Sequence, residues 1–156
     1  MMDLLTALED SAFSTFLRES TSLWAYPTIL TLHTVGLAML VGINTAFDLR
    51  VLGFADAVPL ARIESLFRAM WVGFWLNLIT GAMLFATVAT TKGTATVFMI
   101  KLGLVALGVA AVLLLRRSVY HRDAAPQITR SARTWAVVSL AVWTAAIVTG
   151  RLMAYL

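Results

Sequence analysis

Three ionisable side chains lie inside long apolar stretches of this sequence. They are His33 in "TLHTVG", Lys101 in "FMIKLGLV" and Arg151 in "TGRLMAYL". An ionisable group inside a membrane span costs about 3 kcal/mol on insertion scales, and it usually faces the interior of the helix bundle or a functional site. Counted from the apolar residues that flank them, all three lie within roughly 13 Å of the same membrane surface. We therefore expect them to meet at one site.

Histidine is the metal-binding residue among these three. A neutral imidazole is the usual protein ligand of b-type haem iron, so we predict that His33 is a metal ligand. The second histidine, His121, follows Lys101 by 20 residues, or roughly 30 Å of helix, and one chain cannot offer both histidines to one iron. We interpret His121 as a solvent-exposed loop residue. The sixth iron position is then open, or it is filled by Lys101, Met99, Met153 or a group from a second protomer.

Each candidate also has a purely structural interpretation. Lys101 and Arg151 can extend along the protein toward the outer head groups. His33 can hydrogen-bond a neighbouring helix through Asn77 or Thr80. In the haem interpretation, Lys101 and Arg151 instead balance the negative propionates near the outer surface.

Small residues near these side chains leave room for a ligand or for a second helix. Gly36 lies one turn along the helix from His33, so it leaves space beside the imidazole. Gly73, Asn77 and Gly81 form a second stripe at four-residue spacing. Such residues most often let helix backbones approach, but a planar ligand between helices needs the same gaps. With haem b as the cofactor, the predicted binding residues are His33, Lys101, Arg151, Gly36, Asn77 and Trp143.

The elements that must position these residues follow from the composition. Of 156 residues, 60% are hydrophobic and 13% are charged, and the mean hydropathy is +0.87. These values lie far outside the range of soluble domains. Four stretches are long enough to cross a hydrocarbon core of roughly 30 Å, which takes about 20 helical residues. They cover residues 22–47, 68–91, 95–117 and 133–156.

These stretches are helices rather than barrel strands, because they lack a two-residue alternation of apolar and polar residues. The sequence therefore predicts an all-α fold, an integral membrane four-helix bundle that occupies residues 1–156 as a single transmembrane domain. Pro59 suits the first turn of a helix that continues into the second span, with Glu64 and Arg68 paired. The segment "TTKGT", Thr90 to Thr94, predicts a tight turn that makes the second and third spans an antiparallel hairpin.

The residues before the first span predict a short amphipathic helix over residues 3–18. Apolar residues recur there at three- and four-residue intervals, while the charged ones lie elsewhere around the helix. Two placements are open: an interfacial helix on the outer membrane surface, or a helix packed on the protein itself. The acidic start "MMDLLTALED" predicts no cleaved signal peptide.

Cysteine and charge content narrow the class further. Without cysteine, the chain cannot form disulfides, thiolate-bound iron–sulfur clusters or covalent c-type haem. The net charge of +4 reflects basic residues beside the spans, so we expect no nucleic-acid partner. Only Arg18 and Lys92 lie on the side of the termini, which places both termini outside the cytoplasm. The basic residues on the opposite side are Arg50, Arg62, Arg68, Arg116, Arg117, Arg122, Arg130 and Arg133.

A set of ordered motifs carries a resemblance over Trp24 to Tyr155. The motifs "LHTVGLAMLVG", "DLRVLG", "TGAMLF", "FMIKLGLV" and, with Trp143, "TGRLMAYL" resemble a bacterial family of small four-helix inner-membrane proteins of unassigned function. The first-span histidine and third-span lysine are also similar, more distantly, to the haem-associated membrane protoporphyrinogen oxidase family and to cytochrome b-like and copper-resistance membrane families. In the oxidase family these positions are held important for haem binding and activity, which the resemblance carries to His33 and Lys101. The chain departs from that family at "LLRRSVYH", where "YH" comes several residues late.

These observations predict a membrane-embedded b-type haem protein in a bacterial inner membrane, with both termini periplasmic. Its expected role is electron transfer with a quinone or a periplasmic redox partner. Two alternatives are open: a haem-dependent oxidase acting on a porphyrinogen-like or other small molecule, and a small transporter or structural membrane subunit. Because one chain offers few iron ligands and has surplus small residues, we also predict a homo-oligomer in the lipid bilayer.

Overall fold

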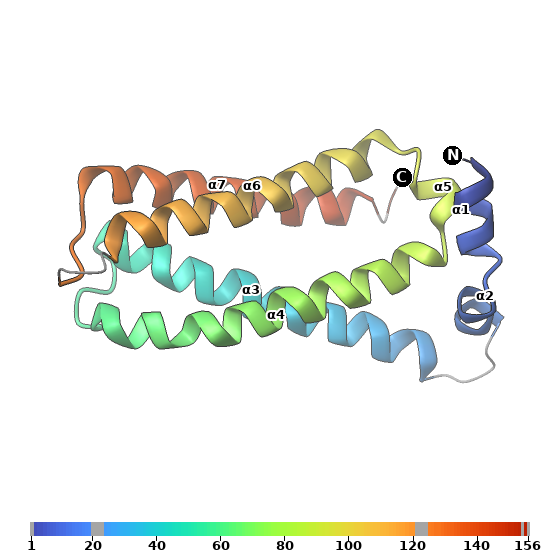
Figure 1. Cartoon of the computed structure of the whole chain (residues 1–156), viewed down its shortest axis with the longest axis horizontal. Helices are drawn as coiled ribbons and strands as arrows, with labels where there is room; N and C mark the ends of the chain where they lie inside the picture. Colours follow the sequence, from blue (N-terminus) through green and yellow to red (C-terminus); the bar gives the residue numbers. More distant parts are fainter. Residues whose placement is uncertain (1, 20–23, 121–124, 154, 156) are drawn as a thin grey trace.

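The computed structural model describes residues 2–19, 24–120, 125–153 and 155, which form helices and no strands. Four of the helices are long and apolar enough to cross a membrane, and they lie side by side along the molecule (Figure 1). The predicted all-α four-helix bundle is therefore confirmed. The helices are α1 (Met2–Glu9), α2 (Ala12–Glu19), α3 (Ala25–Leu52), α4 (Leu60–Ala86), α5 (Ala89–Lys92), α6 (Thr96–Val119) and α7 (Arg130–Leu152).

The ends of the long helices follow local backbone chemistry. α3 ends before Gly53, which has a left-handed φ of 97° and donates its N–H to the last turn. α4 begins directly after Pro59, as predicted, although Glu64 pairs with Arg116 at 3.6 Å and not with Arg68. The side chain of Thr129 caps α7 by accepting a hydrogen bond from the backbone of Ala132 at 3.1 Å.

The first two spans are longer or shifted relative to their predicted ranges. α3 has 28 residues and α4 has 27, so each is about 40 Å long and exceeds the hydrocarbon core. Hydropathy marks the part of a helix that lipid surrounds, but it misses the extra turns beyond it. The predicted second span also ends five residues too late, because Thr87 already terminates α4.

The long helices form two pairs. α3 packs along α4, α6 packs along α7, and the pairs meet mainly through α3 and α7 (Figure 1). α4 and α6 run antiparallel, but they do not form the closely packed hairpin that the sequence predicts. The predicted tight turn is limited to Gly93 and Thr94, because residues 90–92 belong to the short helix α5, which leads the chain from one pair to the other.

Buried apolar side chains gather in one half of the bundle, which we call the core half. It contains the C-terminal halves of α3 and α6 and the N-terminal halves of α4 and α7. The other half, the divergent half, has little apolar burial, since α6 has no buried residue before Gly108. The two pairs also separate toward this end (Figure 1). The core cluster comprises Leu40, Phe47, Val51, Ile63, Phe67, Met70, Val112, Leu115, Val119, Ala132, Ala136, Trp143 and Ala146.

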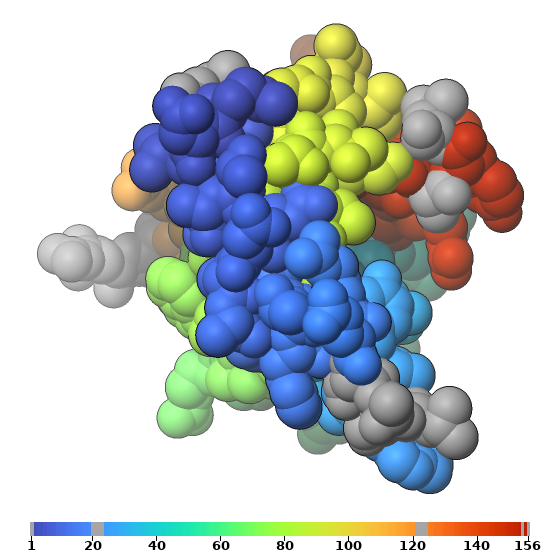
Figure 2. All heavy atoms as spheres, turned by 90° about the vertical axis from the view of Figure 1, so that its right-hand side faces the viewer, coloured from blue at the N-terminus to red at the C-terminus, as the bar shows by residue number. Residues whose placement is uncertain are grey.

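Two short helices, α1 and α2, lie across the end of the divergent half (Figure 2). The sequence predicts a single helix over residues 3–18, but the chain breaks after Glu9. The Ser11 hydroxyl donates to the carbonyl of Leu8 at 2.7 Å and accepts from the backbone N–H of Ser14 at 3.3 Å, which ends one helix and caps the next. The sequence pattern missed this break because the apolar spacing continues through it.

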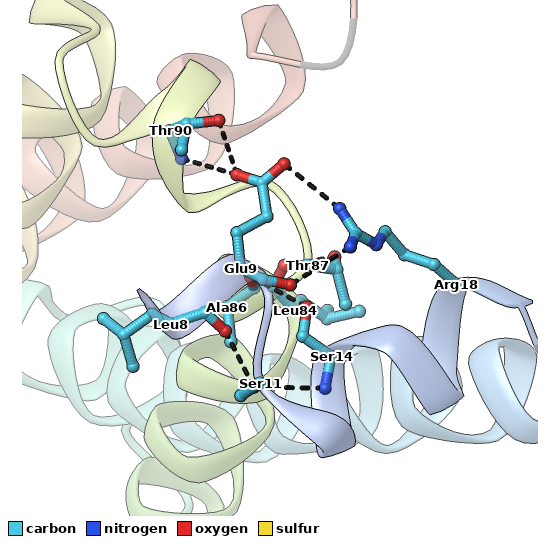
Figure 3. Close-up of polar contacts among 9 residues, drawn as sticks. All are labelled: Leu8, Glu9, Ser11, Ser14, Arg18, Leu84, Ala86, Thr87 and Thr90. Carbon is cyan, nitrogen blue, oxygen red and sulfur yellow. Dashed lines mark hydrogen bonds and ion pairs between the residues drawn. The ribbon is translucent and has the colours of Figure 1, made fainter. Parts of the chain in front are cut away.

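The N-terminal helices are attached to the bundle by polar contacts (Figure 3). The Glu9 carboxylate accepts hydrogen bonds from the backbone N–H of Thr90 at 2.7 Å and from its hydroxyl at 2.5 Å. Arg18 binds the other carboxylate oxygen at 3.1 Å, and the Ser14 hydroxyl donates to the carbonyl of Ala86 at 3.1 Å. The structure thus shows the packed placement of these helices. Leu4 and Phe16, 72% and 60% exposed, still present an apolar face outward.

Candidate functional site

His33 points from α3 toward α4 in the divergent half. Its Nδ1 lies 3.0 Å from the backbone carbonyl oxygen of Asn77 and 3.1 Å from the hydroxyl of Thr80. A carbonyl oxygen only accepts hydrogen bonds, so Nδ1 carries the proton in this contact. The neutral imidazole then has its lone pair on Nε2, which lies 3.5 Å from the amide nitrogen of Asn77 and is an atom through which a histidine can bind metal.

The neighbours of His33 on α4 hold the imidazole in place. The amide nitrogen of Asn77 donates to the backbone carbonyl of His33 at 2.8 Å. A Cβ atom added at Gly81 would lie 3.0 Å from the Cε1 atom of His33, so the ring packs where α4 has no side chain. Both predicted polar contacts to the neighbouring helix, through Asn77 and Thr80, are therefore formed. They fix the ring, whatever else it binds.

Gly36 does not leave the open space that the sequence suggests. A Cβ atom at Gly36 would lie 2.7 Å from the backbone nitrogen of Asn77 and 2.9 Å from the carbonyl oxygen of Gly73. A Cβ at Gly73 would in turn lie 2.9 Å from the backbone nitrogen of Leu40. The two glycines mark a close crossing of α3 and α4. The prediction of Gly36 as a cofactor-binding residue is corrected accordingly, because the α4 backbone fills the room beside it.

Lys101 lies on the opposite side of the divergent half, on α6. Its side chain runs past Gly150 of α7, where an added Cβ would lie 3.7 Å from Nζ. Within the described ranges, this ammonium group has no hydrogen bond or ion pair, yet it is close enough to His33 for the two groups to interact through charge. His33 and Lys101 thus lie in the same half of the bundle, on different helix pairs.

Two other predicted residues, both on α7, have different surroundings. Arg151 is exposed in the last turn of α7. Trp143 is 2% exposed and packs on α6, where a Cβ at Gly108 would lie 2.8 Å from its indole ring. Trp143 is therefore a core residue of the α6–α7 interface, and its assignment to the cofactor site is corrected. The sequence misled us because tryptophan at helical spacing from Gly150 fits either role.

The sequence interpretation missed a second polar cluster, formed by Asn44 and Asp48 of α3 and Ser139 of α7. All three side chains are fully buried in the core half. The amide nitrogen of Asn44 donates to Asp48 Oδ2 at 3.3 Å and to the Ser139 hydroxyl at 2.8 Å. Their four-residue spacing continues the face of Gly36 and Leu40, a signal that was hidden because the first span was predicted to end at residue 47.

Tyr120 closes the core half where α6 ends. Its hydroxyl donates to the backbone carbonyl of Leu60 at 2.8 Å, and its ring stacks on Phe47 with centroids 5.9 Å apart. Burial, with a smaller contribution from the Glu64 carboxylate, raises the pKa of Tyr120 to about 12. The phenol is therefore neutral at physiological pH and serves as a hydrogen-bond donor.

The donor set determines which metals fit. The described part of the chain contains no group of three or more His, Cys, Asp or Glu side chains that could hold an ion. A site built from several protein ligands is therefore not supported. Haem iron takes four ligands from the porphyrin, so a single histidine with its Nδ1 proton bound to a carbonyl oxygen fits its needs. His121 and Arg122, which the sequence places in a cytoplasmic loop, lie outside the described residues.

Comparisons with known proteins add no family assignment. No protein-family model matches the chain, and no curated protein or solved structure is similar enough to be matched to it. Function is therefore inferred from the geometry of the chain itself.

Proposed function

We propose that this protein is a membrane-embedded b-type haem protein with His33 as an axial iron ligand. The supporting observation is the contact between His33 Nδ1 and the carbonyl oxygen of Asn77 at 3.0 Å, which orients the ring and places its lone pair on Nε2. Second hydrogen bonds of this kind fix the tautomer and orientation of metal-bound histidines. The haem would supply one-electron redox chemistry, and the proposed role is electron transfer with a quinone or a periplasmic partner.

The other residues of the divergent half have supporting roles in this proposal. Lys101 offers an ammonium group that forms no ion pair among the described residues and is suited to a propionate carboxylate. Asn77 and Thr80 hold the imidazole, and exposed Arg151 contributes positive charge at the outer rim. These residues bind and orient the cofactor. We also place both termini in the periplasm, on the distribution of basic residues.

A homo-oligomer completes the proposal. Within the described ranges each chain offers one histidine, and Gly42 and Gly103 have no atom of another residue close to where their Cβ would lie. Such open glycines let a helix of a second copy approach. A group from that copy would then be available as the sixth ligand.

The resemblance to the oxidase family favours a second candidate, a haem-dependent oxidase acting on a porphyrinogen-like or other small molecule. This candidate would require that the sixth coordination position of the haem iron stays open, instead of being filled by a second protein ligand. A third candidate, a transporter or structural subunit, is favoured by the fact that the hydrogen bonds of the His33 side chain all go to α4. In that case the imidazole serves helix packing alone.

An absorption spectrum tests the haem proposal. Protein purified from cells with ample haem is expected to show a Soret band and the reduced α-band of b-type haem. His33→Ala is expected to lose most of the haem while staying folded, and added imidazole is expected to restore part of it by entering the space left by the side chain. His121→Ala is the matched control and should bind haem normally. Colourless wild-type protein after haem supplementation would refute the proposal, and a full spectrum in His33→Ala would refute the ligand.

A further inference from the structure

The buried cluster of Asn44, Asp48 and Ser139 contains polar atoms without a partner. Each of these side chains is 0% exposed. Among the described residues, neither Asp48 Oδ1 nor Asn44 Oδ1 has a hydrogen-bond partner. A buried acceptor left unpaired costs about 1 to 3 kcal/mol. Two such acceptors in one cluster therefore indicate that a further species binds there.

The carboxyl group of Asp48 also has no positive charge to balance it. Two cationic side chains near this end of the bundle are engaged elsewhere: Arg50 pairs with Asp56 at 3.0 Å and Arg116 with Glu64 at 3.6 Å. The polar neighbours of Asp48 are Asn44 on its own helix and Ser139 on α7, and neither carries a charge.

Other elements packed against this cluster contribute no balancing charge either. From α4, the buried neighbours of α3 at this level are Ile63, Phe67 and Met70. At the end of α6, the titratable group is Tyr120, whose hydroxyl donates a hydrogen bond to a carbonyl oxygen. An isolated carboxylate in such a place costs several kcal/mol, so burial favours the neutral acid over the carboxylate.

We propose that Asn44, Asp48 and Ser139 form a proton-binding site, in which Asp48 takes up one proton from water and holds it as a carboxylic acid. The proton bonds to Asp48 Oδ1, which turns that oxygen into a donor toward Asn44 Oδ1. Together with the observed contact from Asn44 Nδ2 to Asp48 Oδ2 at 3.3 Å, this forms the two-bond pair of an acid with an amide. One proton thereby satisfies both unpaired oxygens.

A metal cation explains the same atoms less well. Hard cations such as Ca²⁺ and Mg²⁺ take about six or more oxygen ligands, whereas this cluster offers two free oxygens and a hydroxyl already in a hydrogen bond. Ionisable residues inside membrane domains commonly serve proton relays. The site stands independently of the haem proposal, since its residues lie in the other half of the bundle.

Infrared spectroscopy of the protein in nanodiscs tests this inference directly. With aspartate carboxyl carbons labelled by ¹³C, the wild type at neutral pH is expected to show the carbonyl stretch of one protonated acid, shifted by exchange into D₂O. Asp48→Asn, which keeps the shape of the neutral acid, is expected to lose that band completely. The matched control is Asp56→Asn, because Asp56 is 76% exposed and paired with Arg50, so its removal should leave the band unchanged.

The remaining outcomes also decide the question. Absence of an acid band at neutral pH in folded wild-type protein would overturn the proposal, and a carboxylate band that shifts with Na⁺ would assign the cluster to a cation. An acid band that survives in Asp48→Asn would place the proton on another aspartate. If Asp48→Asn does not fold, Ser139→Ala tests the assignment instead. Loss of this neighbouring hydroxyl should shift the acid band if the band belongs to Asp48, and should leave it in place if the band belongs to another aspartate.

Discussion

Two polar clusters lie on the same face of α3 and differ in how their atoms are satisfied. His33 and Asp48 are 15 residues apart, or about 22 Å along the helix. The His33 side chain is partly exposed, and its bonded nitrogen has acceptors on α4. The Asp48 side chain is fully buried and keeps one oxygen without a partner. One helix thus carries a partly exposed polar cluster and a fully buried one.

The difference comes from what covers each cluster. In the core half, α7 lies against α3, and Ser139 reaches Asn44 within 2.8 Å. In the divergent half, the pairs separate, and Lys101 of α6 interacts with His33 through charge without forming an ion pair or hydrogen bond. The fully buried α3–α7 contact, by contrast, admits only a proton or another very small species.

The largest expected effect comes from the crossing that separates the two halves. Gly73→Leu places a side chain where even a Cβ lies 2.6 Å from the Cβ of Met39 and 2.9 Å from the backbone nitrogen of Leu40. Because backbone cannot move aside cheaply, we expect the free energy of unfolding to fall by about 3 kcal/mol. Unfolding in mixed detergent micelles measures this.

Gly42→Leu provides the control for that substitution, since no atom lies within 4 Å of its added Cβ. It should change the unfolding free energy little in a monomer. Equal losses in the two variants would mean that the α3–α4 crossing is not where the structure places it.

A matched pair of hydroxyl deletions compares the two clusters. Ser139→Ala removes a sealed acceptor and leaves Asn44 Nδ2 with only its long contact to Asp48, so a loss of about 1 to 2 kcal/mol in unfolding free energy is expected. Thr80→Val removes one of two acceptors of His33 Nδ1, and the Asn77 carbonyl remains, so the loss should be about 0.6 kcal/mol. The reverse order would contradict the distinction between the halves.

The sequence predicts the divergent half better than the core half. Ionisable residues within apolar runs reveal His33 and Lys101, because their cost in lipid is large and local to each helix. Asp48 escaped notice because it lies near the end of α3, where a charged residue looks like a solvated flank. Only the position of α7 shows that it is sealed.

The contacts of the glycines are also only partly predictable from the sequence. Their presence predicts close packing somewhere, but sequence cannot say whether Gly36 faces a ligand or the backbone of α4. The sequence likewise cannot say which helices pack as pairs. A short connection favours packing between helices that are consecutive in the chain. α4 and α6 are instead joined through α5 and belong to different pairs.

The smallest expected effect concerns the N-terminal helices that cover the divergent half. The Thr90 hydroxyl and N–H, and then Arg18, hold the pKa of Glu9 below its ordinary value of 4.5. The carboxylate therefore stabilises the attachment of α1 at pH values above 4.5, and this contribution is lost as the pH falls through the lowered pKa. The protection of the α1 amides against hydrogen exchange, relative to their intrinsic rates at each pH, should fall in that acidic range.

Glu9→Gln should lower the protection of the α1 amides at neutral pH and abolish the acid dependence of that protection. Glu19→Gln is the control, because Glu19 is exposed at the end of α2. Exchange that is insensitive to both pH and Glu9→Gln would show that apolar contacts, not this carboxylate, attach the helix.

The arrangement of the helices in two pairs has a consequence for biosynthesis. α3 and α4 are made first and can join at Gly36 and Gly73 as soon as both are in the membrane. Asn44 and Asp48, however, receive Ser139 and the cover of α7 only when the last helix has been inserted. Until then a carboxyl group and an amide face lipid or the insertion machinery, which marks the nascent chain as unfinished. A chain that stops short of α7 keeps its first pair but exposes these groups permanently, so membrane quality control has a signal for distinguishing it from the complete protein.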